Sequence, residues 1–371
     1  MAHTVEQLVG VGPRGPGSDG ERRAAILLRR VLRDGGRQAQ LETVWVRPQW
    51  PLAHAWHCAL GIAGSALAAL APVAGLVVLA VTLASLLLDL GGRGWLARRL
   101  TPQRATQNVV SPPRAPGRDY RLVVCANYDA GRTGATHRTR ITVPRPFAWL
   151  TGALVVLLGC AVARVAGAPA GAMGAVQLVP TIGLVLAVAA LLDLALSPAS
   201  PGAGDNAAGV AVALALVAML DAAPPERLDV ELLLTGAGES PGLGLRAHLR
   251  HRRPRLDRRT TIVVGLSACG AGSPVWLSHE GTLLPAATHQ QLRAACAGLG
   301  ARPARSHRLS AFAPARQARL PEITLGARDD QGQIPRSHTP EDTPENVNPS
   351  TLKATLELAL RLVDALDEEL A

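Results

Sequence analysis

Acidic, amide, hydroxyl and imidazole side chains gather in five short clusters of the sequence, each next to an apolar segment. Side chains of these types bind ligands and transfer protons. In sheets with parallel strands, sites form at the carboxyl ends of the strands. Four clusters follow segments expected at that edge, and the fifth begins a helix. The clusters are Asn127-Tyr128-Asp129, Gly238-Glu239, Ser267, Ser337-His338-Thr339 and, at the helix start, Gly204-Asp205-Asn206.

The segments between these clusters alternate between strand and helix patterns. Ser18-Asp19 is a typical cap for a helix that ends near Arg33, Asp205-Asn206 begins a helix to about Leu220, and Asn348-Pro349 begins the last helix. This alternation predicts an α/β fold with a mostly parallel sheet sandwiched by helices. The predicted strands are 41–46, 106–110, 121–126, 229–235 and 261–266.

The composition indicates that part of the chain lies in lipid. Of the 371 residues, 48% are hydrophobic and only 18% are charged, whereas soluble domains carry roughly 25% charged residues. Aromatic residues make up 3% of the chain, which leaves few rings on which bases could stack. Despite the net charge of +10, we therefore expect no nucleic-acid partner.

Two long apolar blocks, residues 53–92 and 146–196, are each predicted to form a transmembrane helical hairpin. Pro72 divides the first block, so a single span with a re-entrant piece is an alternative there, and buried helices of a soluble protein are the general alternative. Arginines flank both blocks, which predicts a multi-pass membrane protein whose polar part is cytoplasmic. These arginines are Arg47, Arg93, Arg98, Arg99, Arg104, Arg132, Arg138, Arg140 and Arg145.

Outside the two blocks, the sequence resembles the M28 family of zinc peptidases. Three motifs keep their internal spacing: SPGAGDNAAGVAVAL, LTGAGESPGLGLRA and SHTPEDTPENV. RGPGSDGERRAAILLRRVL and LVVCANYDAG are similar to the family's first helix and to its strand that ends in His-x-Asp. The resemblance implies a zinc-exopeptidase-like domain formed by residues 1–50, 104–145 and 197–371, with both hairpins as insertions.

The resemblance also implies roles for individual residues. The family holds two zinc ions, and Asp205 matches its bridging aspartate, Glu239 a glutamate ligand and His338 the late histidine ligand. Three ligands of this kind with one open position suit a catalytic zinc ion. Taken singly, Asp205 is also an ordinary helix cap, Glu239 a surface acid and His338 a loop residue.

The other family positions are degenerate. Asn127 stands where the first histidine ligand is expected, and Ser267 where the second aspartate ligand is expected. Gly238 occupies the position of the general base, so no catalytic residue is assigned. Asp129 is interpreted as a remnant of the His-x-Asp motif. The cofactor prediction is therefore at most one zinc ion.

Three functions remain open at this stage. The first is a membrane-embedded M28-like pseudopeptidase that binds a peptide or protein. The second is an active single-zinc aminopeptidase or glutaminyl-cyclase-like enzyme with a base from elsewhere in the chain. The third is a polytopic membrane scaffold or transporter component. The apolar blocks contain few charges, and Arg164 is the one clear candidate for an intramembrane charge. This argues against a transport site, because such sites need more ionisable groups.

Overall fold

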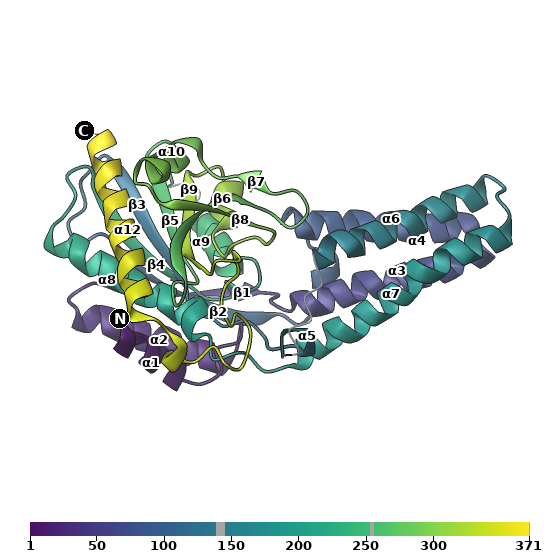
Figure 1. The fold of residues 1–371 in the computed structure, drawn as a ribbon, viewed down its shortest axis with the longest axis horizontal. Helices are drawn as coiled ribbons and strands as arrows, with labels where there is room; N and C mark the ends of the chain where they lie inside the picture. Colours follow the sequence, from purple (N-terminus) through teal and green to yellow (C-terminus); the bar gives the residue numbers. More distant parts are fainter. Residues whose placement is uncertain (139–144, 253–255, 371) are drawn as a thin grey trace. The chain divides into compact units, whose positions relative to one another are not determined.

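The computed structural model describes residues 1–138, 145–252 and 256–370. The chain forms two compact units (Figure 1). One unit, here called the α/β unit, comprises Met1–Pro48, Gln103–Thr133 and Pro198–Ala371. The other, the helical unit, comprises Gln49–Pro102 and Gly134–Ser197. Arg140 and its neighbours 139–144, within the predicted segment 104–145, lie outside the described residues.

A nine-stranded sheet forms the centre of the α/β unit in the order β1-β2-β4-β3-β5-β9-β6-β7, with β8 paired to β6. Parallel pairing joins β4, β3, β5 and β9, and antiparallel pairing adds β1 and β2 on one side and β6 and β7 on the other. The strands are β1 Gln40–Val46, β2 Arg104–Ser111, β3 Tyr120–Asn127, β4 Leu228–Thr235, β5 Thr261–Leu266, β6 Ser273–Glu280, β7 Ala286–Ala287, β8 Arg302–Ser306 and β9 Glu322–Arg328.

Helices cover both faces of this sheet, which confirms the predicted α/β class. Successive residues of a strand point to opposite faces, so Val124 belongs to one buried cluster and Val123 to the other. The first cluster is covered by α1 Ala2–Gly10, α2 Asp19–Asp34, α8 Ala208–Ala222, α10 Gln290–Gly298 and α12 Pro349–Glu369, and the second by α9 Leu243–Arg252 and α11 Ala313–Gln317.

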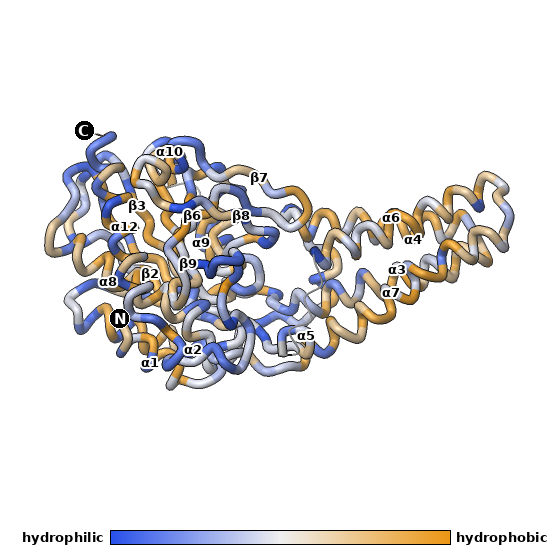
Figure 2. Tube along the Cα trace, viewed as in Figure 1, coloured by the Kyte–Doolittle hydropathy of each residue, from blue (hydrophilic) through white to orange (hydrophobic). Residues whose placement is uncertain are grey.

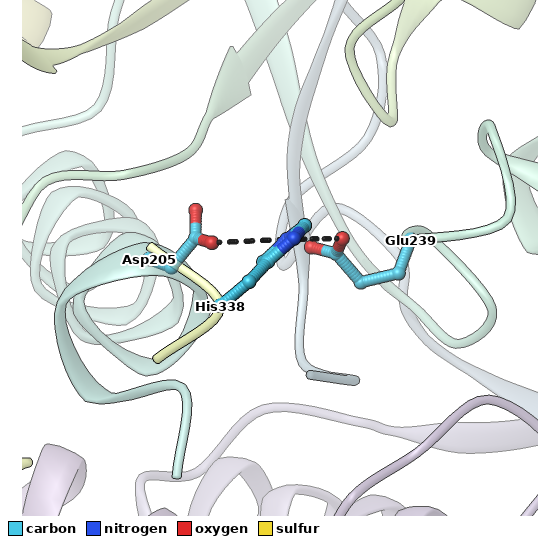
Figure 3. A group of neighbouring side chains, drawn as sticks. All are labelled: Asp205, Glu239 and His338. Carbon is cyan, nitrogen blue, oxygen red and sulfur yellow. Dashed lines mark hydrogen bonds and ion pairs between the residues drawn. The ribbon is translucent and has the colours of Figure 1, made fainter. Parts of the chain in front are cut away.

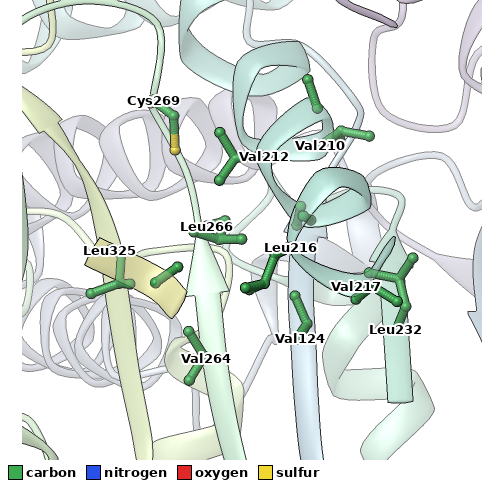
Figure 4. Close-up of a cluster of buried hydrophobic side chains, with 14 of the residues drawn as sticks. Val124, Val210, Val212, Leu216, Val217, Leu232, Val264, Leu266, Cys269 and Leu325 are labelled. Atoms are coloured by element: carbon green, nitrogen blue, oxygen red, sulfur yellow. The ribbon is translucent and has the colours of Figure 1, made fainter. Parts of the chain in front are cut away.

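Helix α8 is the central helix of the first cluster. Its residues Leu216 and Val217 lie against Val124, Leu232 and Val264 of three neighbouring strands (Figure 4). Each such side chain contributes about 1.5–3 kcal/mol when it is fully buried. This packing fixes the beginning of α8, where the helical turn η2 Ala203–Ala207 carries Asp205.

The two predicted helix caps outside α8 are present. The Ser18 hydroxyl accepts a hydrogen bond from the Glu21 amide at the start of α2, and the Asn348 side chain accepts one from the Ser350 amide at the start of α12. Such caps contribute about 1 kcal/mol each. A short 3-10 turn, η4 Pro344–Asn346, precedes α12.

The helical unit contains four long apolar helices: α3 Trp50–Leu70, α4 Pro72–Leu90, α6 Pro146–Val165 and α7 Ala170–Leu196. Each is long and apolar enough to cross a membrane (Figure 2). A fifth stretch, Ala203–Ala222, also meets that criterion, but it corresponds to η2 and α8 in the core of the α/β unit. The first apolar block forms two helices, because Pro72 begins α4. The unit also contains η1 Ala97–Leu100 and α5 Ala135–Arg138.

Polar groups inside the helical unit are more numerous than the sequence indicated. Arg98 forms a buried two-pronged ion pair with Asp89, with donor–acceptor distances of 2.8–3.0 Å. His57 Nε2 lies 2.9 Å from Ser85 Oγ, and His57 Nδ1 lies 3.4 Å from His54 Nδ1. The prediction that placed Arg98 only on the polar flank missed this ion pair, because the partner Asp89 lies nine residues earlier on another element.

Candidate metal centre

Asp205, Glu239 and His338 lie together in the α/β unit, although 34 and 99 residues separate them in sequence. Asp205 is in η2, Glu239 is in the turn after β4, and His338 is in the loop between β9 and α12 (Figure 3). His338 Nε2 lies 3.0 Å from Glu239 Oε2 and 3.4 Å from Asp205 Oδ2. One ligand atom from each residue can be chosen so that all lie within 4.8 Å of one another.

The position of the His338 ring depends on a glycine and on an unusual backbone conformation. A Cβ atom added at Gly131 would lie 2.3 Å from His338 Nε2, so the ring occupies the space that any other side chain there would fill. His338 itself has a φ of 59°, a left-handed conformation that is uncommon outside glycine. This strained backbone directs the imidazole between the two carboxylates.

Asp205 is held by two residues of the His338 loop. The Asp342 carboxylate accepts hydrogen bonds from the Gly204 amide at 2.6 Å and from the Asp205 amide at 3.3 Å. Ser337 Oγ donates to Asp205 Oδ2 at 2.6 Å. The loop that supplies the histidine therefore also orients the aspartate, a role of Ser337 and Asp342 that the sequence motif alone does not reveal.

Glu239 is held in a similar way. Asp129, which is fully buried, accepts hydrogen bonds from the Gly238 amide at 2.8 Å and the Glu239 amide at 2.9 Å. Asn206 Nδ2 donates to Glu239 Oε1 at 2.7 Å, which leaves Oε2 toward His338. Residues that hydrogen-bond to a metal ligand without binding the metal themselves fix the orientation of that ligand.

The charges of the three residues are strongly linked. Burial and the nearby Glu239 carboxylate raise the pKa of Asp205. Burial acts to raise the pKa of Glu239, but the charge and hydrogen bond of His338 lower it overall. Burial acts to lower the pKa of His338, and the Glu239 and Asp205 carboxylates raise it overall. The metal-free group thus favours an imidazolium between carboxylates, and a metal ion that binds there must displace that proton.

The remaining predicted positions do not join this group. Asn127 Nδ2 donates to Asp129 Oδ1 at 3.3 Å, and Ser267, directly after β5, makes main-chain hydrogen bonds through its amide to Leu325. Gly238 packs against Asn127 so closely that a Cβ atom at residue 238 would lie 2.3 Å from Asn127 Cβ. Within the described ranges, the ligand-type residues gathered here are the Asp, Glu and His of a single site.

The chemistry of this group is compatible with a zinc ion. Zinc binds histidine nitrogen and carboxylate oxygen at 2.0–2.2 Å in tetrahedral geometry, which places ligand atoms about 3.3 to 3.5 Å apart. The distances of His338 Nε2 to the two carboxylates, 3.0 and 3.4 Å, are close to that spacing. Three protein ligands leave a position for water or substrate, as in catalytic zinc sites.

Comparisons with known proteins identify a family match and similar folds. Residues 184–363 match the model of peptidase family M28. The fold is similar to Bacteroides thetaiotaomicron glutaminyl cyclase bound to N-acetylhistamine, with a TM-score of 0.56, 14% identity and coverage of 98% of this chain and 96% of that chain. It is also similar to a Zn-dependent exopeptidase from Parabacteroides distasonis, with a TM-score of 0.56, 14% identity and coverage of 99% and 96%.

A third similar structure is Porphyromonas gingivalis glutaminyl cyclase, with a TM-score of 0.55, 15% identity and coverage of 98% of this chain and 96% of that chain. No curated protein matches the chain in sequence. At these identities the structural likeness establishes the fold, and the match to the family model identifies the segment that bears Asp205, Glu239 and His338. Residues 184–363 therefore match peptidase family M28, and the fold is similar to that of a Zn-dependent exopeptidase and of glutaminyl cyclases.

Proposed function

We propose that the α/β unit binds one zinc ion through Asp205, Glu239 and His338, and that it is a catalytically impaired M28-type site that binds a peptide or protein ligand. The observation that carries the proposal is the group of three ligand-type residues, whose candidate atoms lie within 4.8 Å of one another. When bound, zinc would supply a Lewis acid for a carbonyl oxygen of the ligand.

The impairment is argued from the residue beside Glu239. Gly238 has no side chain, so it cannot take a proton from water, a step worth roughly 10²–10⁴-fold in such reactions. The two acids beside the ligands, Asp129 and Asp342, use their oxygens as acceptors for backbone amides. Asn127 fills the space beside Gly238. These contacts favour a binding role over hydrolysis.

An active single-zinc aminopeptidase or glutaminyl-cyclase-like enzyme is the second candidate, and the same complete ligand group favours it. The two candidates separate in an assay of zinc-loaded, detergent-purified protein on aminoacyl amides and on peptides with N-terminal glutamine. The binding role predicts no turnover above buffer. Zinc-dependent turnover that disappears in His338→Ala would instead support the enzyme.

For the helical unit, we propose that α3, α4, α6 and α7 span the membrane as two hairpins and that the α/β unit is cytoplasmic. The support is the length and apolar surface of these helices and the arginines that flank them in sequence. The bilayer is then the partner of their exposed faces. The hairpin tips, at Ala71 and at residues 166–169, would lie outside the cell.

Cysteine labelling in intact cells tests this topology, because all five native cysteines are buried. An Ala71→Cys variant should react with a membrane-impermeant maleimide, and a Glu369→Cys variant on α12 should react only after permeabilisation. The reverse pattern would contradict the orientation, and reaction of both in intact cells would contradict the cytoplasmic location of the α/β unit.

A further inference from the structure

Two fully buried carboxylates lie beside the turn that carries Glu239. Glu21 comes from the first turn of α2, and Asp129 follows β3 by two residues. Both side chains have 0% exposure. Buried charges are retained only where partners compensate them, so the partners of these two groups indicate what they do.

Their partners are three successive backbone amides of the turn. The Ala237 amide donates to Glu21 Oε1 at 2.7 Å. The next two amides, of Gly238 and Glu239, donate to Asp129 at 2.8 and 2.9 Å. Ala237 has a φ of 49°, a left-handed conformation that costs an alanine roughly 1 kcal/mol or more. The two carboxylates stabilise this turn in a conformation that its own residues disfavour.

The rest of the network ties the carboxylates to rigid elements. Glu21 Oε2 accepts hydrogen bonds from Thr106 Oγ1 on β2 and from the Gly17 amide, both at 2.8 Å. The buried guanidinium of Arg14 donates to the Tyr128 carbonyl at 2.9 Å and to the Pro201 and Gly202 carbonyls before Asp205. Burial lowers the pKa of Arg14 to about 10, so at neutral pH it is a cation beside Asp129.

Holding two acids together in the core is energetically unfavourable. Burial and the charge of Asp129 raise the pKa of Glu21 to about 8. Burial and the charge of Glu239 raise the pKa of Asp129 to about 7. An ordinary turn needs no buried acids, and a turn that places a metal ligand must hold it within a few tenths of an ångström.

We propose that Glu21 and Asp129 are positioning residues that hold the turn 236–239 so that the Glu239 carboxylate faces Asp205 and His338. This inference rests on the proposed zinc site. It extends that site to Glu21 in α2, more than 160 residues before the segment that matches the family model.

The test compares Glu21→Gln and Asp129→Asn with the wild-type protein. Each amide replaces one acceptor oxygen by an NH₂ group, so one N–H donor in the network faces another donor. The matched control is Glu322→Gln. Glu322 is also buried, and burial together with a neighbouring carboxylate raises its pKa to about 8. Its side chain accepts a hydrogen bond from Thr324 and not from the turn 236–239. Zinc affinity is measured by competition with a chelator, and amide hydrogen exchange of residues 236–239 by mass spectrometry on the metal-free protein.

We expect zinc affinity to fall by about 10–100-fold in both variants, and exchange across 236–239 to become faster. The control should change neither. Folded variants with wild-type affinity and wild-type exchange would overturn the inference. If Asp129→Asn does not fold, Thr106→Val removes one hydrogen bond to Glu21 and should give the same changes at smaller size; no change in that variant would also overturn it.

Failure of the proposed zinc site gives a different result. Wild-type protein that binds no zinc would contradict the proposed function. Amide hydrogen exchange of residues 236–239 would still show whether Glu21 and Asp129 hold the turn. Unchanged exchange in the folded variants would then overturn the positioning role, and faster exchange would support it as a property of the turn itself.

Discussion

A single methyl group at Gly131 should remove zinc binding without altering any ligand. An alanine Cβ there would lie 2.3 Å from His338 Nε2 and 2.4 Å from Cδ2. Carbon and nitrogen atoms in ordinary contact are about 3.5 Å apart, so the ring must withdraw by about 1 Å. The φ of Gly131 is outside the positive range, so alanine itself fits the backbone.

The magnitude follows from the tolerance of metal sites. Ligand distances in real sites stay within about 0.2 Å of their ideal values, and a shift of 1 Å therefore removes His338 from the ligand set. Substitution of a residue that only hydrogen-bonds to a metal ligand already lowers metal affinity by about 10–100-fold. We expect Gly131→Ala to lose at least ~100-fold, which corresponds to about 2.8 kcal/mol.

The assay is a zinc titration in competition with a chromogenic chelator, together with a thermal melt. Gly298→Ala in α10 is the matched control, because no atom lies within 4 Å of a Cβ at that position. A Gly131→Ala protein that melts like the wild type and binds zinc with wild-type affinity would refute the position assigned to the His338 ring.

Four further results are expected. Gly238→Ala should lower the free energy of unfolding by about 1–3 kcal/mol, because the added methyl group overpacks against Asn127. Gly238→Glu alone should not create peptidase activity, because Asn127 occupies the space beside residue 238. Zinc-dependent turnover in the glutamate variant would contradict that steric reasoning. Burial raises the pKa of Glu322 from 4.5 to about 8, so its stabilisation is present below pH 4.5 and lost as the pH rises toward 8. The melting temperature should therefore fall less between pH 6 and 9 in Glu322→Gln than in the wild type. If the melting temperatures of the two proteins fell equally over that range, Glu322 would not be the source of the pH dependence. The hydroxyl oxygens of Ser65 in α3 and Thr181 in α7 are 3.0 Å apart. A double-mutant cycle with Ser65→Ala and Thr181→Val should therefore give a coupling free energy of ~0.6 kcal/mol. Strictly additive effects of the two substitutions would count against this hydrogen bond.

The central strands were predictable because they are buried on both faces. Segments 229–235 and 261–266 are near-continuous apolar runs, and they form β4 and β5 with nearly the same ends. Strands β6 and β9 were not assigned. Their sequences, SPVWLSHE and EITLGAR, carry an acidic residue at one end of the strand, Glu280 in β6 and Glu322 in β9. Both acids are nevertheless buried, which breaks the pattern that identifies a buried strand.

The three ligand-type residues could be named from motif spacing, and the structure brings them together. Their supporting residues could not be named in the same way. Glu21 looks like an ordinary acidic residue in the first turn of a helix, and only the folded chain shows that it bonds Ala237. Gly131 likewise carries no signal beyond its position after Asp129. Local patterns report helices and strands, whereas these contacts join residues that are hundreds of positions apart.

Elemental mass spectrometry of detergent-purified protein tests most directly whether Asp205, Glu239 and His338 hold a single zinc ion. The wild-type protein should contain about one zinc per chain, and His338→Ala should contain none at equal yield of folded protein. Zinc absent from the wild-type protein after incubation with the metal, or retained in full by His338→Ala, would contradict the proposed zinc site.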